Sequence, residues 1–529
     1  MSRPAILLPL PRRTPKAAAA LALAAALAFL EPPWLEAGAA EPAQLDAPAA
    51  ESKPPGGRLE VDVTEAILMA VENNQALKVE RLNPDITQTF EGEQRAIFDP
   101  VVGFDATTNA SRTRSRGGDG QLHSSTGAHT SLGAWIEDFL PTGTTLTFGA
   151  DYSLSGSGTW YHDRFETTRV GLSVTQALLR GCGVSVNLAS LRQARLDTLA
   201  SNYELRGFAE TLVADVEQAY WDCALAERQI EIYAASAKVA EDQLSETVER
   251  IKIGKLAESV LAIAQAEVAS RHEALINARS AYATALLRFL RLLNPSGPNL
   301  WSRQAVLKVH PAAPALLLDD VEAHVRLALR LRPDLNEARL RVRRGELELV
   351  KTRNGLLPKL DLFAALGKSG YATALGRSPS DLSGKGYDAS VGITFEFPLG
   401  NRAATARNDR AAITARQLAE SLTNLEQLAQ LDVRMAYIEV QRSREQVVAS
   451  AATRKAREVA AATEAARLRE GKSTPFLVAI AQRDLLASQI TEVEAVVSLL
   501  KGLVDLHRAE GSVLERRGIA APGRESLAP

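Results

Sequence analysis

Few residues in this 529-residue chain have the types and spacing that chemistry requires. Gly471-Lys472-Ser473 is superficially similar to the end of a phosphate-binding loop, but the earlier glycine of that motif would fall at Ala466. The seven histidines show neither i, i+4 pairing nor the spacing of metal ligands. No Gly-x-Ser-x-Gly nucleophile motif is present. We therefore expect no enzyme activity, no cofactor and no metal site.

Gly471-Lys472 belongs instead to a long helical hairpin that occurs twice. Residues 184–291 and 401–508 align without a gap at a single offset. The matched pairs include Asp215-Val216 with Asp432-Val433, Ala219-Tyr220 with Ala436-Tyr437, and Gly254-Lys255 with Gly471-Lys472. Both copies turn at Gly-Lys, where the glycine can adopt the left-handed conformation that ends a helix. This self-similarity indicates a duplicated unit.

Apolar residues recur with 4-3 spacing along the first long helix. They are Leu212, Val216, Ala219, Cys223, Ala226, Ile230, Tyr233, Ala237, Ala240 and Leu244. The pattern predicts a coiled-coil seam whose small residues let neighbouring helices approach closely. As one helix, residues 184–253 would measure about 105 Å. That length suits a periplasm-spanning tube better than a compact globule. Because Cys223 lies deep in this helix and Cys182 adjoins a strand end, we expect no disulfide between them.

Each helical hairpin follows a segment in which apolar and polar residues alternate. In the clearest case, Leu146, Phe148, Ala150, Tyr152 and Leu154 fall on one face of a strand. We predict about four strands in the first copy and two in the second, at 360–370 and 387–397. We expect long polar loops at 115–129 and 157–167, opposite a tight turn at 141–143. Together these features favour a transmembrane β-barrel, with a soluble β-sandwich as the alternative.

The N-terminus has the features of a secretory signal. Basic residues precede an apolar run at 17–30, and Ala37-Gly38-Ala39 offers a cleavage site. The run is shorter than the ~20 residues of a membrane-spanning helix, so we favour a cleaved signal over an anchor. Charged residues make up 23% of the chain and the net charge is −2. That balance gives no reason to expect nucleic-acid binding.

The sequence thus predicts a mainly α-helical protein with membrane β-strands, built from a duplicated β-hairpin and long helical hairpin. The predicted segments are a signal peptide at 1–39, a linker at 40–62, a first repeat at 63–293, an inter-repeat linker at 294–318, a second repeat at 319–508 and a flexible tail at 509–529. The first repeat divides into a helix at 63–97, a β segment at 98–182 and a helical hairpin at 183–293. The second divides into a helix at 319–356, a β segment at 357–400 and a helical hairpin at 401–508.

Short motifs at the junctions between these segments are weak singly but specific in their order and spacing. They are Asn73-Asn74 followed by Leu77, Gln176-Ala177-Leu178-Leu179-Arg180-Gly181, Arg332-Pro333-Asp334-Leu335, Leu356-Leu357-Pro358-Lys359-Leu360, and Phe397-Pro398-Leu399-Gly400-Asn401-Arg402. With the duplication, they make the chain resemble the TolC-like outer-membrane efflux proteins, which serve tripartite efflux and type I secretion systems. The resemblance covers about 60–508.

The resemblance implies a homotrimer in outer-membrane lipid, with a β-barrel continued by an α-helical coiled-coil barrel in the periplasm. It implies a passive duct that a periplasmic adaptor (membrane fusion) protein docks to an inner-membrane transporter. The helical tips would contact the adaptor. The candidate contacts are Ile251, Gly254, Lys255, Arg467, Leu468, Gly471, Lys472 and Ser473. The alternative is that these residues only cap helices.

Two features depart from the family. Some relatives carry acidic residues six and nine positions after the second tip glycine, where this chain has Leu477 and Ile480. An apolar constriction there would gate by dewetting. The first β segment also carries an additional hairpin. If both of its strands join the wall, a trimer has about 18 strands rather than about 12. Otherwise the hairpin folds beside the barrel.

The leading functional hypothesis is the outer-membrane exit duct of a tripartite efflux system for small molecules. The same fold would serve a type I protein secretion system. From a different class, the chain could be a structural or adaptor coiled-coil protein of the envelope without a pore. The alternating strands argue against that last hypothesis, because such a protein needs no amphipathic wall.

Overall fold

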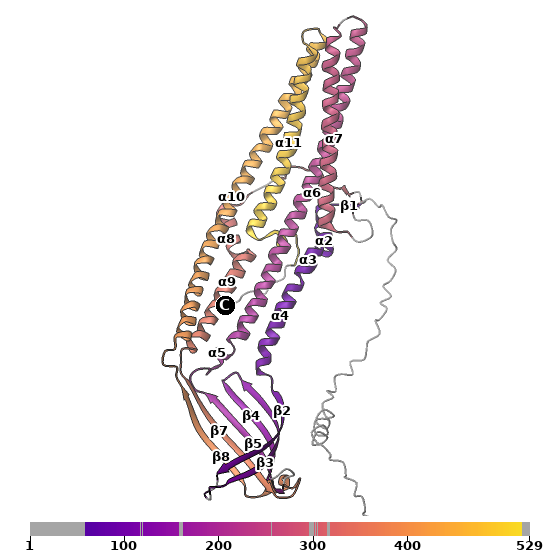
Figure 1. The fold of residues 1–529 in the computed structure, drawn as a ribbon. Coiled ribbons are helices and arrows are strands. Elements are labelled where there is room, and N and C mark those ends of the chain that lie inside the picture. The colour runs from indigo at the N-terminus through magenta and orange to yellow at the C-terminus, as the bar shows by residue number, and fades with distance from the viewer. Residues whose placement is uncertain are drawn as a thin grey trace, which may run out of the picture. The chain divides into compact units, whose positions relative to one another are not determined.

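The computed structural model of the chain describes residues 59–520, except 117, 119, 158–161, 255, 296–300, 302, 304 and 315–317. The expected signal peptide, most of the 40–62 linker and residues 521–529 of the expected tail lie outside the described residues. Within the described part, long helices adjoin a six-stranded antiparallel sheet (Figure 1). This arrangement confirms the predicted fold class. None of the described helices is both long and apolar enough to cross a membrane.

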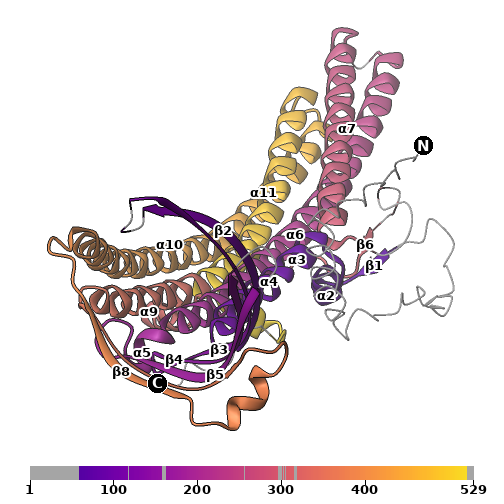
Figure 2. The same ribbon diagram turned by 60° about the horizontal axis from the view of Figure 1, so that its bottom comes forward.

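The sheet contains both predicted β segments, and all of its strands are antiparallel to their neighbours. Its strands are β2 (Val101–Arg116), β3 (Leu122–Leu140), β4 (Thr144–Ser157), β5 (His162–Ala177), β7 (Lys359–Ala372) and β8 (Tyr387–Glu396), paired in that order. Figure 2 shows them as one curved, open sheet that runs from β8 round to β2. The additional hairpin of the first segment is therefore part of the sheet and does not fold beside it.

The expected long loops at 115–129 and 157–167 are shorter than predicted. Residues 122–129 belong to β3, and residues 162–167 belong to β5. Hydroxyl pairs across β2 and β3, such as Thr108 Oγ1 to Thr130 Oγ1 at 3.2 Å, accompany the backbone pairing here. Such pairs stabilise a strand that has no apolar alternation. The prediction relies on that alternation and therefore assigns these parts of the strands to loops. The tight turn is present, with the Gly143 N–H donating to the Leu140 carbonyl over 2.9 Å.

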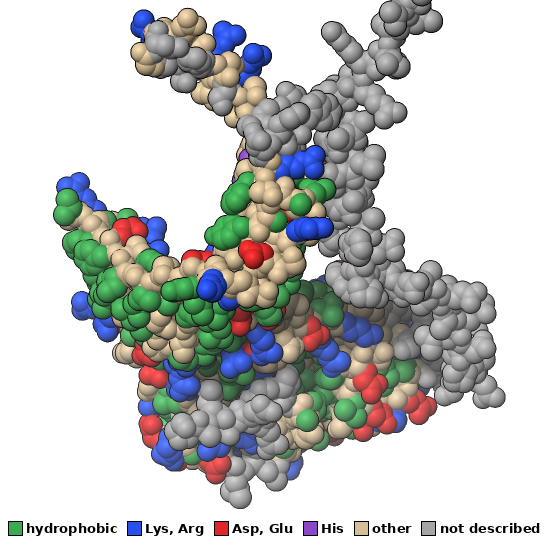
Figure 3. All heavy atoms as spheres, turned by 90° about the horizontal axis from the view of Figure 1, so that it is seen from below, with side chains coloured by type: hydrophobic (Ala, Val, Ile, Leu, Met, Phe, Trp, Pro, Cys, Tyr) green, Lys and Arg blue, Asp and Glu red, His purple; other side chains and the backbone are tan. Residues whose placement is uncertain are grey.

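The two faces of the sheet differ in the side chains that they carry. Residues paired across strands share a face, and one such row crosses the whole sheet. It consists of Val102, Ile136, Phe148, Leu172, Leu366 and Ala389. Most of these apolar side chains are exposed. Hydrophobic side chains gather on the surface at the end of the described chain that contains the sheet (Figure 3). An exposed apolar face that extends across a whole sheet marks a contact with lipid or protein.

The adjacent row lies on the opposite face and is dominated by glycine. It consists of Gly103, Trp135, Gly149, Gly171, Gly367 and Asp388. The Trp135 ring lies over Gly103, where a Cβ atom would come within 2.2 Å of it. Arg169 donates two hydrogen bonds to Asp388, at 2.8 and 3.1 Å, beside Gly367. The small residues thus leave room for the large side chains of their neighbours.

The predicted helix at 63–97 is interrupted twice. Its parts are α2 (Val63–Asn73), α3 (Gln75–Glu80) and α4 (Leu82–Arg95). Asn74 makes the first break, because its side chain accepts from the Leu77 N–H at 3.1 Å and donates to the Leu292 carbonyl at 3.0 Å. The N-cap of α2 is Asp62, which forms a capping box with Glu65.

The predicted helix at 319–356 is also broken. It consists of α8 (Val321–Leu331) and α9 (Pro333–Asn354). Pro333 has no N–H to continue the hydrogen-bond ladder and keeps Arg332 out of the helical conformation, with a φ of −53° and a ψ of 124°. Arg332 then forms ion pairs with Asp334 at 2.8 Å and Asp432 at 2.9 Å. Both motifs of the family resemblance at 73–77 and 332–335 therefore mark helix breaks.

Both predicted helical hairpins are present. They consist of α6 (Ala189–Lys252) with α7 (Ser259–Leu293), and α10 (Arg402–Arg469) with α11 (Pro475–Glu510); the short α5 (Val184–Asn187) precedes α6. The predicted seam is buried or half-buried along its length, with Val216 and Cys223 almost inaccessible. Burial raises the pKa of the Cys223 thiol to about 12. Both cysteines are free, as expected.

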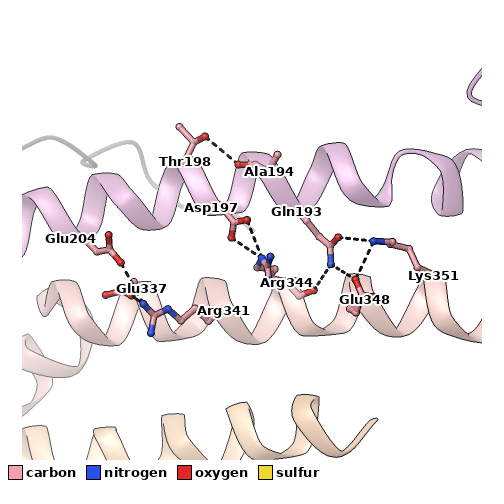
Figure 4. Close-up of polar contacts among 10 residues, drawn as sticks. All are labelled: Gln193, Ala194, Asp197, Thr198, Glu204, Glu337, Arg341, Arg344, Glu348 and Lys351. Carbon is pink, nitrogen blue, oxygen red and sulfur yellow. Dashed lines mark hydrogen bonds and ion pairs between the residues drawn. The ribbon is translucent and has the colours of Figure 1, made fainter. Parts of the chain in front are cut away.

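Helix α9 packs along α6 through polar side chains (Figure 4). Arg344 forms an ion pair with Asp197 at 2.8 Å. Gln193 donates to the Glu348 carboxylate at 3.0 Å and accepts from Lys351 at 3.3 Å. These contacts hold the lower part of α6 against the second repeat, between the sheet and the helix breaks.

The expected linkers and tail contain regular structure. Strand β1 (Leu59–Val61) pairs in parallel with β6 (Ala305–Leu307), which ties together the starts of the two repeats. Helix α12 (Val513–Arg516) buries Val513 and Leu514 against the main core, so the tail is packed up to about residue 520. The prediction of a flexible segment from 509 was wrong because these apolar residues are too few to form a recognisable period.

Gly511 permits the chain to turn into α12. Its φ angle is +69°, and a Cβ atom there would lie 2.8 Å from the Arg332 Cα atom. We expect Gly511→Ala to lower the free energy of unfolding by about 1–3 kcal/mol, because alanine is strained at positive φ and the clash is with backbone. Urea unfolding of the purified protein measures this change. Gly518→Ala is the matched control, since it has the same φ of +69° but open space around it.

His507 should make the folded state sensitive to acid. Burial and the nearby Arg516 guanidinium lower the pKa of His507 from 6.5 to about 4. The stability that this depressed pKa contributes is complete above pH 6.5 and is lost as the pH falls towards 4. Between these pH values, we expect the unfolding free energy of the His507→Asn variant to fall by about 1–3 kcal/mol less than that of the wild type. An unchanged slope of unfolding free energy against pH would contradict this.

Candidate functional site at the helical tips

The two helical hairpins turn by the same local geometry. Gly254 and Gly471 have φ angles of +72° and +73°, and a Cβ atom added to either glycine would have open space around it. At the second tip, the Lys472 N–H donates to the Arg467 carbonyl at 2.8 Å and the Gly471 N–H donates to the Leu468 carbonyl at 3.1 Å. This is a Schellman motif, which requires the left-handed residue that glycine supplies.

Polar side chains fix the second turn further. Lys472 forms an ion pair with Glu470 at 2.9 Å, and Arg467 forms one with Glu464 at 3.5 Å. The Ser473 hydroxyl donates to the same Glu464 carboxylate. Several predicted contact residues therefore have a capping or pairing role within the turn. That role is compatible with a binding surface, because Arg467 and Lys472 remain exposed.

A cavity of 290 Å³ lies between the two tips. One side comes from α6, α7 and their connection, and Leu256 and Val260 are among its apolar residues. The other comes from α10 and α11, with Leu468 and Val478. Arg250 and Arg469 add positive charge at the lining, and Arg250 is paired with Glu246 at 2.5 Å. Asp242, Glu246 and Glu267 also line it, so the cavity combines apolar side chains with charges of both signs.

The structure brings together only part of the predicted contact set. Leu468 lines the cavity, whereas Ile251, Gly254, Arg467, Gly471, Lys472 and Ser473 lie at the turns outside it. Lys255 lies outside the described residues. The prediction missed Leu256, Val260 and Val478. Leu256 lies in the connection before α7, so no helical period in the sequence indicated it.

The proposed constriction residues lie on the first turns of α11. Leu477 is exposed and Ile480 is half-buried, and neither lines the cavity between the tips. Being three residues apart, they share a face of the helix. The neighbouring Val478 is almost fully buried. Leu477 and Ile480 are thus directed differently from the residues that hold the two hairpins together.

Solved structures of outer-membrane channels share this fold. The outer-membrane channel OprN is 18% identical, with a TM-score of 0.64 over 85% of this chain and 90% of that chain. VceC from Vibrio cholerae is 16% identical, with a TM-score of 0.62 over 85% of this chain and 96% of that chain. CmeC from Campylobacter jejuni is 15% identical, with a TM-score of 0.61 over 85% of each chain. A search among curated proteins finds no match.

The sequence itself places the chain within a family. The model of the outer membrane efflux protein family matches residues 66–295 and 325–512, which cover most of both repeats. The chain belongs to the outer membrane efflux protein family. The resemblance to TolC-like proteins that the junction motifs indicate is therefore confirmed.

Proposed function

We propose that this protein is the outer-membrane exit duct of a tripartite efflux system. Small molecules would pass through it by diffusion, with energy supplied by an inner-membrane transporter. The observation that carries the proposal is the joining of an apolar-faced sheet to two long helical hairpins in one member of the efflux family. The sheet would sit in the outer membrane, and the helices would extend through the periplasm.

The edges of the sheet support a closed homotrimer. Strands β2 and β8 are the two edges, and an even number of antiparallel strands makes them run in opposite directions. Strand β8 of one copy can therefore pair with β2 of the next, which removes both exposed edges. Three copies would form a β-barrel of about 18 strands, wide enough for an aqueous channel.

Exposed apolar stripes on the helices next to these edges support the same assembly. Val79 near the end of α3, and Leu82, Ile86 and Phe90 on α4, are exposed at helical spacing. On α10, a second stripe of exposed apolar residues consists of Leu428, Leu431, Met435 and Ile438. Helix α4 leads into edge strand β2, and α10 follows edge strand β8. The stripes therefore lie on the helices that a β2–β8 contact would bring to neighbouring copies.

We assign adaptor docking to the tips and a dewetting constriction to Leu477 and Ile480. The cavity between the hairpins could receive apolar side chains of an adaptor. We expect Leu468→Glu to raise ethidium accumulation in cells to the level of a deletion strain, because a carboxylate would have to be desolvated on docking. Val459→Glu, at an exposed apolar position on the same helix, is the control. Normal efflux by a Leu468→Glu trimer would contradict this docking site.

The proposed function is tested by ethidium accumulation in a deletion strain and its complemented parent. Higher accumulation on deletion, reversed by the wild-type gene, would support an efflux duct. Unchanged accumulation together with lost secretion of a protein substrate would favour a type I secretion duct instead. Extraction without detergent and no conductance in a planar bilayer would indicate a protein without a pore.

A further inference from the structure

A second cavity, of 510 Å³, lies where the sheet meets the helices. Arg180 follows β5, Lys351 and Glu348 come from the end of α9, and Arg402 and Arg407 come from the first turns of α10. Four basic side chains and one acidic side chain therefore line it. Figure 1 shows the start of α10 beside the ends of the strands.

The arginines of this cavity differ from its lysine in how they are paired. Among the described residues, no carboxylate pairs with Arg180, Arg402 or Arg407. Lys351 differs, because Glu348 at 3.2 Å and Gln193 at 3.3 Å hold its ammonium group (Figure 4). The single acidic residue of the lining is thus already used. Three positive charges remain available for a ligand.

Backbone donors face the same place. Asn401 precedes α10 with a φ of +35°, and its side chain donates to the Leu356 carbonyl at 3.1 Å instead of capping the helix. In the described part of the chain, the N–H groups of Arg402, Ala403 and Ala404 have no acceptor. Ala403 and Ala404 line the cavity. Uncapped N–H groups and the positive end of the helix dipole favour an anion there.

An apolar surface adjoins the cavity. Phe395 on β8 and Phe397 after it are exposed, and Leu399 in the turn before α10 is 98% exposed. Pro398, between them, lines the cavity itself. A free phosphate ion would leave these side chains in water. A phosphate that carries acyl chains would cover them.

We propose that this cavity binds the phosphate group of an anionic phospholipid, whose acyl chains lie over Phe395, Phe397 and Leu399. The membrane setting rests on the proposed function, whereas the anion site rests on the cavity itself. The bound lipid anchors the junction between sheet and helices at the inner surface of the outer membrane. The guanidinium groups and the N–H groups at the start of α10 both contribute to binding of the phosphate. Separate variants can therefore test the two contributions.

The test is lipid retention by the purified full-length protein in detergent, measured by native mass spectrometry. The probes are phosphatidylglycerol, phosphatidylcholine and inorganic phosphate. One variant combines Arg180→Gln, Arg402→Gln and Arg407→Gln. A second is Ala404→Asp, which places a carboxylate on the open N–H groups and favours the helix, so folding is retained. The control combines Arg279→Gln, Arg288→Gln and Arg444→Gln, which removes three exposed positive charges outside the cavity.

We expect both cavity variants to bind phosphatidylglycerol at least about tenfold more weakly, because charge-assisted hydrogen bonds are lost, while the control binds as the wild type. Inorganic phosphate that displaces phosphatidylglycerol at equal concentration would show a free anion as the ligand and overturn the lipid assignment. Equal retention of both lipids, or unchanged binding of phosphatidylglycerol by both cavity variants, would show that the cavity is not a site for anionic lipid. Because retention needs no transport, a failed ethidium test would leave this result unaffected.

Discussion

Ile86→Arg combined with Phe90→Arg is expected to abolish the trimer. Both side chains are exposed on α4 and belong to its apolar stripe. In the proposed assembly they pack against a neighbouring copy. Burying each contributes about 1.5–3 kcal/mol per copy, and burying two unpaired guanidinium groups costs further free energy. We therefore expect the trimeric fraction to fall below about a tenth.

Native mass spectrometry and cross-linking of detergent-extracted protein measure this outcome. Gln88→Arg, at an exposed position on another face of α4, adds the same charge and should leave the trimer intact. Helix content from circular dichroism separates failed assembly from failed folding. A stable trimer of the double variant would exclude the α4 stripe from the contact between copies.

Arg206→Met is expected to lower the free energy of unfolding by about 3–5 kcal/mol, because it leaves the buried Glu210 carboxylate without its partner. Arg206 and Glu210 are almost inaccessible on α6, and their side chains pair at 3.0 Å. Arg206 also pairs with Glu515 of α12 at 2.5 Å and donates to the Gly511 carbonyl at 3.2 Å. It therefore holds the C-terminal segment against the first repeat.

Two comparisons make this result specific. Arg228→Met removes an arginine whose ion pair with Glu231 is half exposed, and should change the unfolding free energy by less than about 1 kcal/mol. Replacing Arg206, Glu210 and Glu515 together by methionine should restore most of the loss, because no charge is then left buried. A triple variant as unstable as Arg206→Met would show that packing, and not the unpaired carboxylates, causes the loss.

The candidate site was only partly predictable. The Gly-Lys pairs located both turns, because a left-handed helix end has a recognisable sequence. The cavity between the tips depends on how α7 packs near α11, and this relation has no local signature. Leu468 was among the predicted residues because it lies near a turn, whereas Val478 was not, because the cavity that it lines forms only where the two hairpins meet.

Long elements with a strong period followed from the sequence alone. The seam through Val216, Cys223 and Ala237 predicted α6, and strict alternation at 146–154 predicted β4. Both periods arise from the backbone geometry of a single element, so a single chain displays them. The duplication likewise required no structure, since it is a comparison of the chain with itself.

Tertiary structure alone decided the rest. It placed the additional hairpin within the sheet, interrupted a helix at Asn74, and packed residues 511–520 against α6. Each of these outcomes depends on a partner distant in sequence, such as the Leu292 carbonyl for Asn74 and Arg206 for the C-terminal segment. A local pattern records the conformation of an element, but only the folded chain shows which distant donor, acceptor or surface completes it.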